Sequence, residues 1–248
     1  MPADGKCRGL FITGTDTGVG KTVIAAAIAR HFSRSGLKVG IMKPCETGVD
    51  DVRQPGEDAR LLRWAAGSGD DNDLIAPYRF REPLAPSLAA EREGVIIDPV
   101  RIGEALATIG AGKDLVVVEG AGGLMVPLRG GYLIADLVRQ LGLPLLVVSR
   151  AALGTINHTL LTIMAARNME LPLAGFVINL MPAHPGAAEE AAPHLLAALA
   201  SADLLGVFPE VAGTPENRID QLADVLGDSP ALPWLLHAIG LPPVCNNP

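Results

Sequence analysis

A glycine-rich segment near the N-terminus combines the residue types that bind phosphate. Gly18, Gly20, Lys21 and Thr22 follow a short apolar run at 10–12 and precede an apolar run of helical period. Strand, glycine loop and helix in this order are the context that a phosphate-binding loop requires. Successive backbone N–H groups and the helix N-terminus attract an anion. Lys21 is then placed to contact the β- and γ-phosphates, and the Thr22 hydroxyl to bind Mg²⁺.

The spacing of this loop departs from the general pattern by one residue. The pattern requires glycine at position 15, whereas this chain has Thr15, with Gly14 one residue earlier. The alternative interpretation is a glycine-rich turn followed by an ordinary surface lysine. We favour the phosphate loop because Gly18, Gly20, Lys21 and Thr22 occur together in the right context.

Two further predicted strands end in residues that could act on a bound nucleotide. Residues 37–42 predict a strand that ends at Lys43, and residues 114–119 predict a buried strand that ends at Glu119. Ligands of open α/β sheets bind at the carboxyl ends of the strands. Glu119 resembles the acid that lies beside Mg²⁺ in nucleotide sites, and the small residues at 120–123 let the backbone approach a ligand. Taken alone, Lys43 is better explained as a lysine that ends a strand.

The remaining pattern predicts the elements that position these residues. Strands alternate with helices along the chain, which predicts an α/β fold of three layers, with a mostly parallel central sheet and helices on both faces. Residues 67–73 are expected to form a polar loop and 75–80 an extended segment. The helix at 187–200 is expected only to pack. Other expected strands are 145–149, 176–178 and 204–208, and other expected helices begin near Asp58, Ser87, Pro99 and Ile156.

Length and composition are those of one globular domain. The 248 residues are 49% hydrophobic and 19% charged, with a net charge of −7 and no basic cluster, which argues against nucleic acid as the main partner. The three cysteines, Cys7, Cys45 and Cys245, are too far apart to suggest a zinc site, and we expect a reducing compartment. We predict a single domain over 1–248 with a peripheral tail at 228–248, no membrane span and a cytoplasmic location.

Few other polar residues have a pattern that indicates a catalytic or metal-binding role. His158 begins a helix and is better explained as structural, and the other four histidines are scattered. Cys45 could react if it lies near Lys43, but a small side chain that fills space is the better interpretation.

Several of these segments together resemble the dethiobiotin synthetase family, whose fold is that of the P-loop NTPases. The most specific is the lengthened loop at 14–22, which this family shares. The resemblance extends from about Leu10 to Asn217 and includes Lys43-Pro44 with Thr47-Gly48, the segment 118–123, the segment 153–158, Asn179, and 209–217.

The resemblance implies a role for each matched residue. Lys21, Lys43 and Thr47 are the implied catalytic residues, and Lys43 would stabilise charge on the transferred phosphoryl group. The implied Mg²⁺ ligands are Thr22, Asp58 and Glu119. The implied substrate-binding residues are Lys43, Thr47, Gly154, Thr155, Ile156 and Asn157. The implied ATP-binding residues are Thr15, Asp16, Thr17, Gly18, Val19, Gly20, Lys21, Thr22, Asp58, Glu119, Gly120, Gly122, Asn179, Pro209, Glu210, Val211 and Glu216, of which Asn179, 209–211 and Glu216 would read the adenine.

The implied reaction has three steps. 7,8-Diaminopelargonic acid takes up CO₂ as a carbamate, ATP with Mg²⁺ phosphorylates the carbamate, and the second amine closes the ureido ring of dethiobiotin, releasing ADP and phosphate. The family acts as a homodimer, with the substrate carboxylate at the N-terminus of the partner's helix near Asn157. Glu46 is expected either to contact a cationic amine or to face solvent.

Two other classes of protein share parts of this pattern. Amidotransferase-like synthetases share the loop and sheet but are longer and carry a glutamine-hydrolysing part. Nucleotide-dependent switches, such as partitioning-type P-loop ATPases, typically carry a second lysine early in the loop, where this chain has Thr15 and Asp16. Nucleotide selectivity among ATP, CTP and GTP does not follow from the sequence.

Overall fold

A six-stranded parallel sheet forms the centre of the molecule. The computed structural model describes residues 8–242. The strands lie in the order β10-β9-β8-β1-β5-β2, and every neighbouring pair is parallel. They are β1 (Gly9–Gly14), β2 (Val39–Met42), β5 (Leu115–Gly123), β8 (Leu145–Arg150), β9 (Leu173–Met181) and β10 (Leu204–Pro209). The prediction of an α/β fold with a mostly parallel sheet is confirmed.

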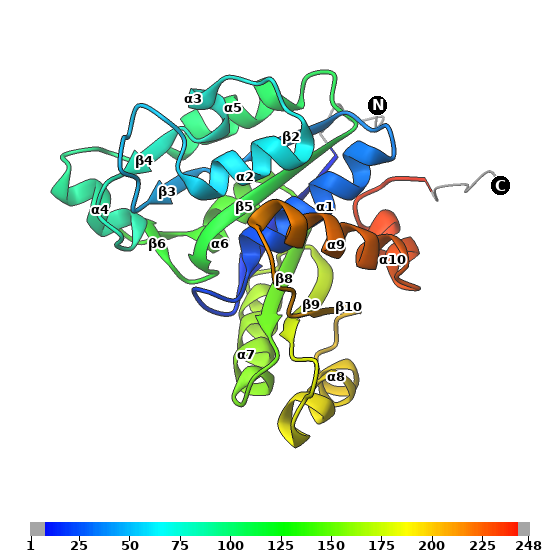
Figure 1. Ribbon diagram of the computed structural model, residues 1–248. Coiled ribbons are helices and arrows are strands. Elements are labelled where there is room, and N and C mark those ends of the chain that lie inside the picture. The colour runs from blue at the N-terminus through cyan, green and yellow to red at the C-terminus, as the bar shows by residue number, and fades with distance from the viewer. Residues whose placement is uncertain (1–7, 243–248) are drawn as a thin grey trace.

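Helices cover both faces of the sheet (Figure 1). On one face pack α1 (Lys21–Arg34), α2 (Glu57–Ala66), α9 (Pro215–Gly227) and α10 (Leu232–Ala238). On the other pack α5 (Pro99–Gly110), α6 (Ile134–Leu141), α7 (Thr155–Asn168) and α8 (Ala187–Leu199). Alternation along β1 explains the two cores, because Leu10 and Ile12 enter the first core and Phe11 enters the second.

Short accessory elements lie beside the carboxyl ends of the central strands. They are β3 (Cys45–Thr47), which pairs in parallel with β4 (Tyr78–Phe80), the antiparallel pair β6 (Pro127–Arg129) and β7 (Tyr132–Leu133), and the helices α3 (Asn72–Ile75) and α4 (Pro86–Arg92). The loop expected at 67–73 and the extended segment expected from Ile75 are therefore partly wrong. The Asp71 carboxylate accepts a hydrogen bond from the Asp73 N–H at 2.9 Å, so a polar run caps a short helix.

The segment predicted as a peripheral tail contributes to the core. Leu235 and Leu236 of α10 are buried, as are Ile239 and Leu241 beyond it. The expectation is therefore wrong for 232–241, because these apolar side chains cover the end of the sheet beside β9 and β10. Residues 243–248, with Cys245, and residues 1–7, with Cys7, lie outside the described part of the chain.

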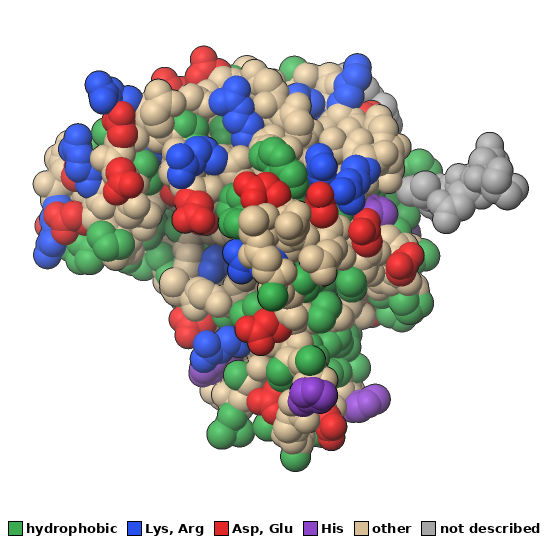
Figure 2. Space-filling view, in the orientation of Figure 1, with side chains coloured by type: hydrophobic (Ala, Val, Ile, Leu, Met, Phe, Trp, Pro, Cys, Tyr) green, Lys and Arg blue, Asp and Glu red, His purple; other side chains and the backbone are tan. Residues whose placement is uncertain are grey.

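Acidic and basic side chains are interspersed on the face shown in Figure 2, which has no continuous basic patch. Within residues 8–242, no helix has both the length and the apolar character needed to cross a membrane.

Candidate functional site

The glycine-rich loop joins β1 to α1 and is held by hydrogen bonds to β8 and to its own backbone. The Thr15 N–H donates to the Val148 carbonyl at 2.9 Å, which holds the start of the loop on β8. The Lys21 ammonium donates to the Asp16 carbonyl at 3.0 Å and closes the loop. Burial lowers the pKa of Lys21, with Glu119 acting against this effect. The loop therefore presents Thr17, Gly18 and the first turn of α1 to a cavity of about 700 Å³.

Asn179, near the carboxyl end of β9, forms a hydrogen bond to the backbone of this loop. The side chain is only 1% exposed, and its amide nitrogen donates to the Val19 carbonyl at 3.1 Å. A Cβ at position 20 would overlap that nitrogen, and Gly20 has a φ of 85°. Glycine is therefore required at position 20 both by space and by backbone conformation. The buried Asn179 Oδ1 has no hydrogen-bond partner among the described residues, and Asn179 is not among the residues that line the cavity.

Lys43 and Glu119 meet because their strands are neighbours. Met42 of β2 pairs with Val118 of β5, so the next residue of each strand lies at the same edge of the sheet. The Lys43 ammonium lies 2.7 Å from Glu119 Oε1 and 2.6 Å from Oδ2 of Asp58, in the first turn of α2. Lys43 is 4% exposed and Glu119 is not exposed at all.

The electrostatics of this cluster keep the Lys43 ammonium charged. Burial alone would lower the pKa of Lys43, but the carboxylates of Glu119 and Asp58 outweigh burial and raise it above its ordinary value. Burial raises the pKa of Glu119, and Lys43 partly offsets this effect. Burial also acts to raise the pKa of Asp58, but Lys43 outweighs it and the net change is downward.

The residues expected to bind Mg²⁺ surround the same ammonium. The Thr22 hydroxyl donates to Glu119 Oε1 at 2.9 Å, while the buried Glu119 Oε2 has no partner among the described residues. Two carboxylates and one hydroxyl are hard oxygen donors, and Mg²⁺ commonly takes one or two carboxylates and fills its remaining positions with water and phosphate oxygens. The set fits Mg²⁺ on these terms. Within 8–242, no group of three or more His, Cys, Asp and Glu side chains could hold a metal ion.

Glu46 is buried and caps α2, so the expectation that it faces solvent is wrong, while its contact with a cationic amine stays a prediction. Its Oε2 accepts from the Gly56 N–H at 2.9 Å and its Oε1 from the Ala59 N–H at 3.3 Å. Gly56 precedes α2 and has no side chain with which to cap it, so a carboxylate from β3 takes that role. Burial raises the pKa of Glu46, and Lys43 opposes this. Glu46 thus orients the helix turn that carries Asp58.

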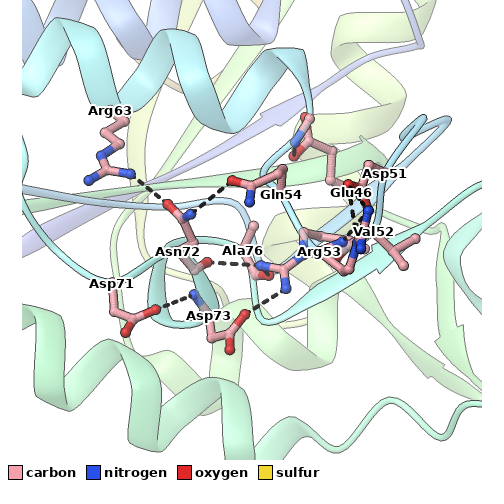
Figure 3. A network of polar contacts seen from close by, with 12 residues as sticks. Glu46, Asp51, Val52, Arg53, Gln54, Arg63, Asp71, Asn72, Asp73 and Ala76 are labelled. Carbon is pink, nitrogen blue, oxygen red and sulfur yellow. Dashed lines mark hydrogen bonds and ion pairs between the residues drawn. The ribbon is translucent and has the colours of Figure 1, made fainter.

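A polar network holds the loop before α2 (Figure 3). The Asn72 side chain accepts from Arg63 Nη1 at 2.6 Å and donates to Gln54 Oε1 at 3.4 Å. Arg79 Nε donates to the Val52 carbonyl at 2.6 Å. These contacts connect α2, α3 and β4 with the acidic loop at 49–56. The loop is thereby a defined structure, and it delivers Asp58 to the cavity.

Cys45 is buried in the core beside the site. Burial raises the pKa of its thiol to about 12. A thiol with this pKa is almost wholly protonated near neutral pH, so Cys45 is a poor nucleophile. This agrees with the interpretation that Cys45 fills space.

The cavity brings together part of the predicted site. It is lined by Thr17, Gly18, Gly20, Lys21, Thr22, Lys43, Thr47, Asp58, Glu119 and Gly122 from the predicted set, and by Val23, Cys45, Glu57, Leu61, Pro83, Leu84, Ala85, Pro86, Ala121, Val126 and Arg218, to which the sequence analysis gave no ligand-binding role. Only Arg218 carried a usable signal, since a base in the first turn of a helix opposes the helix dipole. Residues 83–85 form the turn before α4 and Pro86 is the first residue of that helix, and the sequence gives no chemical signal there.

Other predicted residues lie outside this cavity. Thr15 and Asp16 line a second cavity of about 430 Å³, together with Met125 of the β5–β6 connection and Leu161 of α7. Gly120 continues β5, which runs on to Gly123 rather than ending at Glu119. Val19 is buried, and Pro209, Glu210 and Glu216 are exposed near the start of α9 while Val211 is half-buried.

The predicted substrate residues at the start of α7 do not line the cavity that contains Lys43 in the same chain. Gly154 precedes α7 with a φ of 95°, Ile156 is half-buried and Asn157 is exposed. Thr155 is 6% exposed, and its buried hydroxyl has no partner among the described residues. These four residues line neither cavity.

Comparisons with known proteins agree on a family. A family model described as an AAA domain matches residues 8–217. The ATP-dependent dethiobiotin synthetase of Thermodesulfovibrio yellowstonii is 42% identical over 226 residues, which cover 87% of this chain and 94% of the relative. The enzyme of the same name from Bacillus subtilis (strain 168) is 35% identical over 235 residues, which cover 94% of this chain and 100% of the relative.

Solved structures of lower identity share the fold. A ParA family ATPase from Chlorobium tepidum gives a TM-score of 0.55 at 17% identity, covering 94% of this chain and 99% of that one. The cell division protein MinD from Aquifex aeolicus gives 0.53 at 16% identity, covering 94% and 95%. At these identities the likeness extends to the fold alone.

Proposed function

The chain belongs to the ATP-dependent dethiobiotin synthetase family, an ATP-dependent ligase family of biotin biosynthesis, and we propose that the 700 Å³ cavity is where it performs that reaction. In this proposal, 7,8-diaminopelargonic acid is carboxylated by CO₂, the carbamate is phosphorylated by ATP, and ring closure releases phosphate. The observation that carries the proposal is the Lys43 ammonium, buried 2.7 Å from Glu119 and facing the same cavity as Lys21. We infer that the chain is a single α/β domain.

Positioning and charge neutralisation are the tasks of the protein in this reaction. The carbamate and the γ-phosphate are both anionic, so they approach each other only where positive charge compensates them. Lys21 and Lys43 supply that charge from either side of the transferred phosphoryl group. Thr47, half-buried in the cavity wall, donates its hydroxyl proton to a carbamate oxygen.

The nucleotide lies along the glycine-rich loop with its base toward β9 and β10. The free Oδ1 of Asn179 accepts from the exocyclic amine of adenine, while its Nδ2 holds the loop. Pro209, Glu210, Val211 and Glu216 border the base. The phosphates are also surrounded by backbone groups beside the glycines of the loop, from Thr15, Asp16, Val19, Gly120 and Gly122.

Thr22, Asp58 and Glu119 would hold Mg²⁺ together with phosphate oxygens. When bound, the ion neutralises charge on the β- and γ-phosphates. Support comes from the partnerless Oε2 of Glu119 and from the hydroxyl of Thr22, which already lies 2.9 Å from the same carboxylate.

The second substrate site is proposed to form between two copies of the chain. Gly154, Thr155, Ile156 and Asn157 sit at the N-terminus of α7, whose amides attract a carboxylate. Nearby apolar side chains are exposed, with Leu153 at 89%, Leu161 at 56%, Met164 at 59% and Met125 at 55%. An isologous dimer would bury this surface and bring each α7 N-terminus to the partner's cavity. We propose a cytoplasmic location for this dimer.

The nucleotide-switch alternative is supported only by a likeness of fold at 17% identity or less. Relatives at 42% and 35% identity over most of the chain favour the ligase.

Phosphate release by the purified protein tests the proposal. With ATP, Mg²⁺ and bicarbonate, release should require 7,8-diaminopelargonic acid, and dethiobiotin should form in equal amount by mass spectrometry. Release that is indifferent to the diamine would exclude this reaction and favour a nucleotide switch. Lys21→Ala should abolish release, and the exposed Lys38→Ala, at the other end of β2, should leave it unchanged.

A further inference from the structure

Arg218 extends into the 700 Å³ cavity from the first turn of α9. Its Nε is fully buried and has no hydrogen-bond partner. The backbone N–H of Arg218 donates to the Thr214 carbonyl at 3.0 Å, but across residues 8–242 its side chain forms no hydrogen bond and no ion pair. The side chain therefore brings a buried donor and a positive charge to the cavity wall.

This placement is unfavourable in the free chain. A buried N–H without a partner destabilises the protein, and a cation in the first turn of a helix opposes the helix dipole. Neighbouring arginines at the same helix–helix contact do have partners. Arg30 Nε lies 2.9 Å from Asp220 Oδ1, and Arg34 lies 2.8 Å from the same oxygen. An anionic ligand would relieve both costs at Arg218.

The position of α9 indicates which anion that is. Arg30 pairs with Asp220 and Arg34 with Asp224, so α1 and α9 lie side by side in the same direction. The first turn of each helix contributes to the cavity wall, through Thr22 and Val23 from α1 and through Arg218 from α9. The first turn of α1 is the phosphate-binding end of that helix.

We propose that Arg218 binds a phosphate oxygen of the nucleotide and so completes the phosphate site from α9. The inference rests on the proposed function, because it takes the nucleotide to lie along the glycine-rich loop. Guanidinium groups suit this role, since they remain charged and their N–H groups match the geometry of phosphate oxygens. The remaining carboxylates of the cavity wall, Glu57 and Asp58 on α2, leave Arg218 unpaired.

Equilibrium binding to Arg218→Met tests the inference, with ATP, ADP and adenosine as probes. Methionine keeps the apolar stem and removes the charge and the Nε–H. We expect ATP and ADP to bind about 10- to 100-fold more weakly, as the loss of a charged hydrogen bond predicts. Adenosine affinity should not change, and the dependence of ADP affinity on salt should become shallower. Arg218→Lys, which keeps a charge but loses the fork of donors, should lose less.

Arg60→Met is the matched control, because Arg60 is exposed on α2, does not line the cavity, and changes the net charge equally. The inference is overturned if Arg218→Met binds ADP like the parent, if adenosine weakens as much as ADP, or if only the KM of the diamine rises. A parent protein that binds no ATP would instead overturn the proposed function. If Arg218→Met fails to fold, the test uses Arg218→Lys instead. If that variant folds and keeps both the ADP affinity and the salt dependence of the parent, the inference is overturned.

Discussion

The Lys43 ammonium and the Glu119 carboxylate form a buried ion pair, with 2.7 Å between Nζ and Oε1, at the ends of the adjacent strands β2 and β5. Asp58 completes the pairing at 2.6 Å. The lysine proposed to act on the γ-phosphate thus lies among the oxygens proposed to bind Mg²⁺. Without a nucleotide, the Lys43 ammonium neutralises the carboxylates of Glu119 and Asp58. Nucleotide binding would give both Lys43 and these carboxylates new partners.

Lys43→Met should lose both activity and stability. Removal of a charge that acts on the transferred phosphoryl group should lower kcat by about 100- to 1,000-fold. Glu119 would remain buried without its partner, which should cost about 3 kcal/mol in the free energy of unfolding, measured with urea. Adding Glu119→Gln to Lys43→Met should recover part of the stability and none of the activity. Lys113→Met removes a half-buried pair with Asp70, away from the cavity, and should cost about 1 kcal/mol with full activity. Normal turnover in Lys43→Met would remove the role proposed for Lys43.

Glu119→Gln should raise the Mg²⁺ concentration needed for half-maximal phosphate release by about tenfold or more, because a neutral amide is a poorer Mg²⁺ ligand than a carboxylate. Mg²⁺ titrations at saturating ATP measure this shift, and excess EDTA should stop the reaction. Glu104→Gln changes an exposed acid on α5 and serves as the control. Unaltered Mg²⁺ dependence in Glu119→Gln would show that Glu119 does not bind the ion.

Gly20→Ala and Gly36→Ala separate crowding from backbone strain. Both glycines have a φ of 85°, but a Cβ at Gly36 meets nothing within 4 Å, whereas one at Gly20 overlaps the Asn179 amide. Gly36→Ala should therefore cost about 1–2 kcal/mol from strain alone. Gly20→Ala should cost more and should abolish ATP binding as measured by calorimetry. Equal stabilities of the two variants would contradict the contact between Gly20 and Asn179.

The free energy of unfolding should fall as the pH is lowered below about 6.5, partly because of His31. Burial lowers the pKa of His31 from 6.5 in the folded chain. The unfolded chain therefore takes up a proton first as the pH falls, and that uptake favours unfolding. Urea midpoints at pH 8 and pH 5.5 measure the effect. His31→Gln should reduce the difference between them, whereas the exposed His194→Gln should preserve it. If His31→Gln shows the same difference in urea midpoint between pH 8 and pH 5.5 as the parent, the pH dependence arises from other groups.

The central fold could be predicted because its signals are local. Buried parallel strands are continuous apolar runs, as in 115–118, and the glycine loop has a fixed order of residue types. Lys43 and Glu119 could be placed at one edge because parallel strands end together. Glu46 could not be assigned, since its cap on α2 depends on the path of the loop at 49–56, which brings Gly56 beside Glu46. Arg218 was missed for a related reason, because only the packing of α9 on α1 brings it to the cavity.

Mixing two inactive variants tests whether the site spans two copies of the chain. Lys43→Met disables the phosphoryl-transfer side, and Asn157→Asp places a carboxylate where the substrate carboxylate is proposed to bind. If Asn157 acts on the partner's cavity, a mixed dimer contains one intact site and one site with both changes. Random exchange of subunits in equal amounts should then restore about a quarter of the parent activity. If Asn157 acts within its own chain, every site carries one change and no activity returns. Light scattering should give a dimer mass for each variant, and a monomer that turns over normally would contradict the interface site.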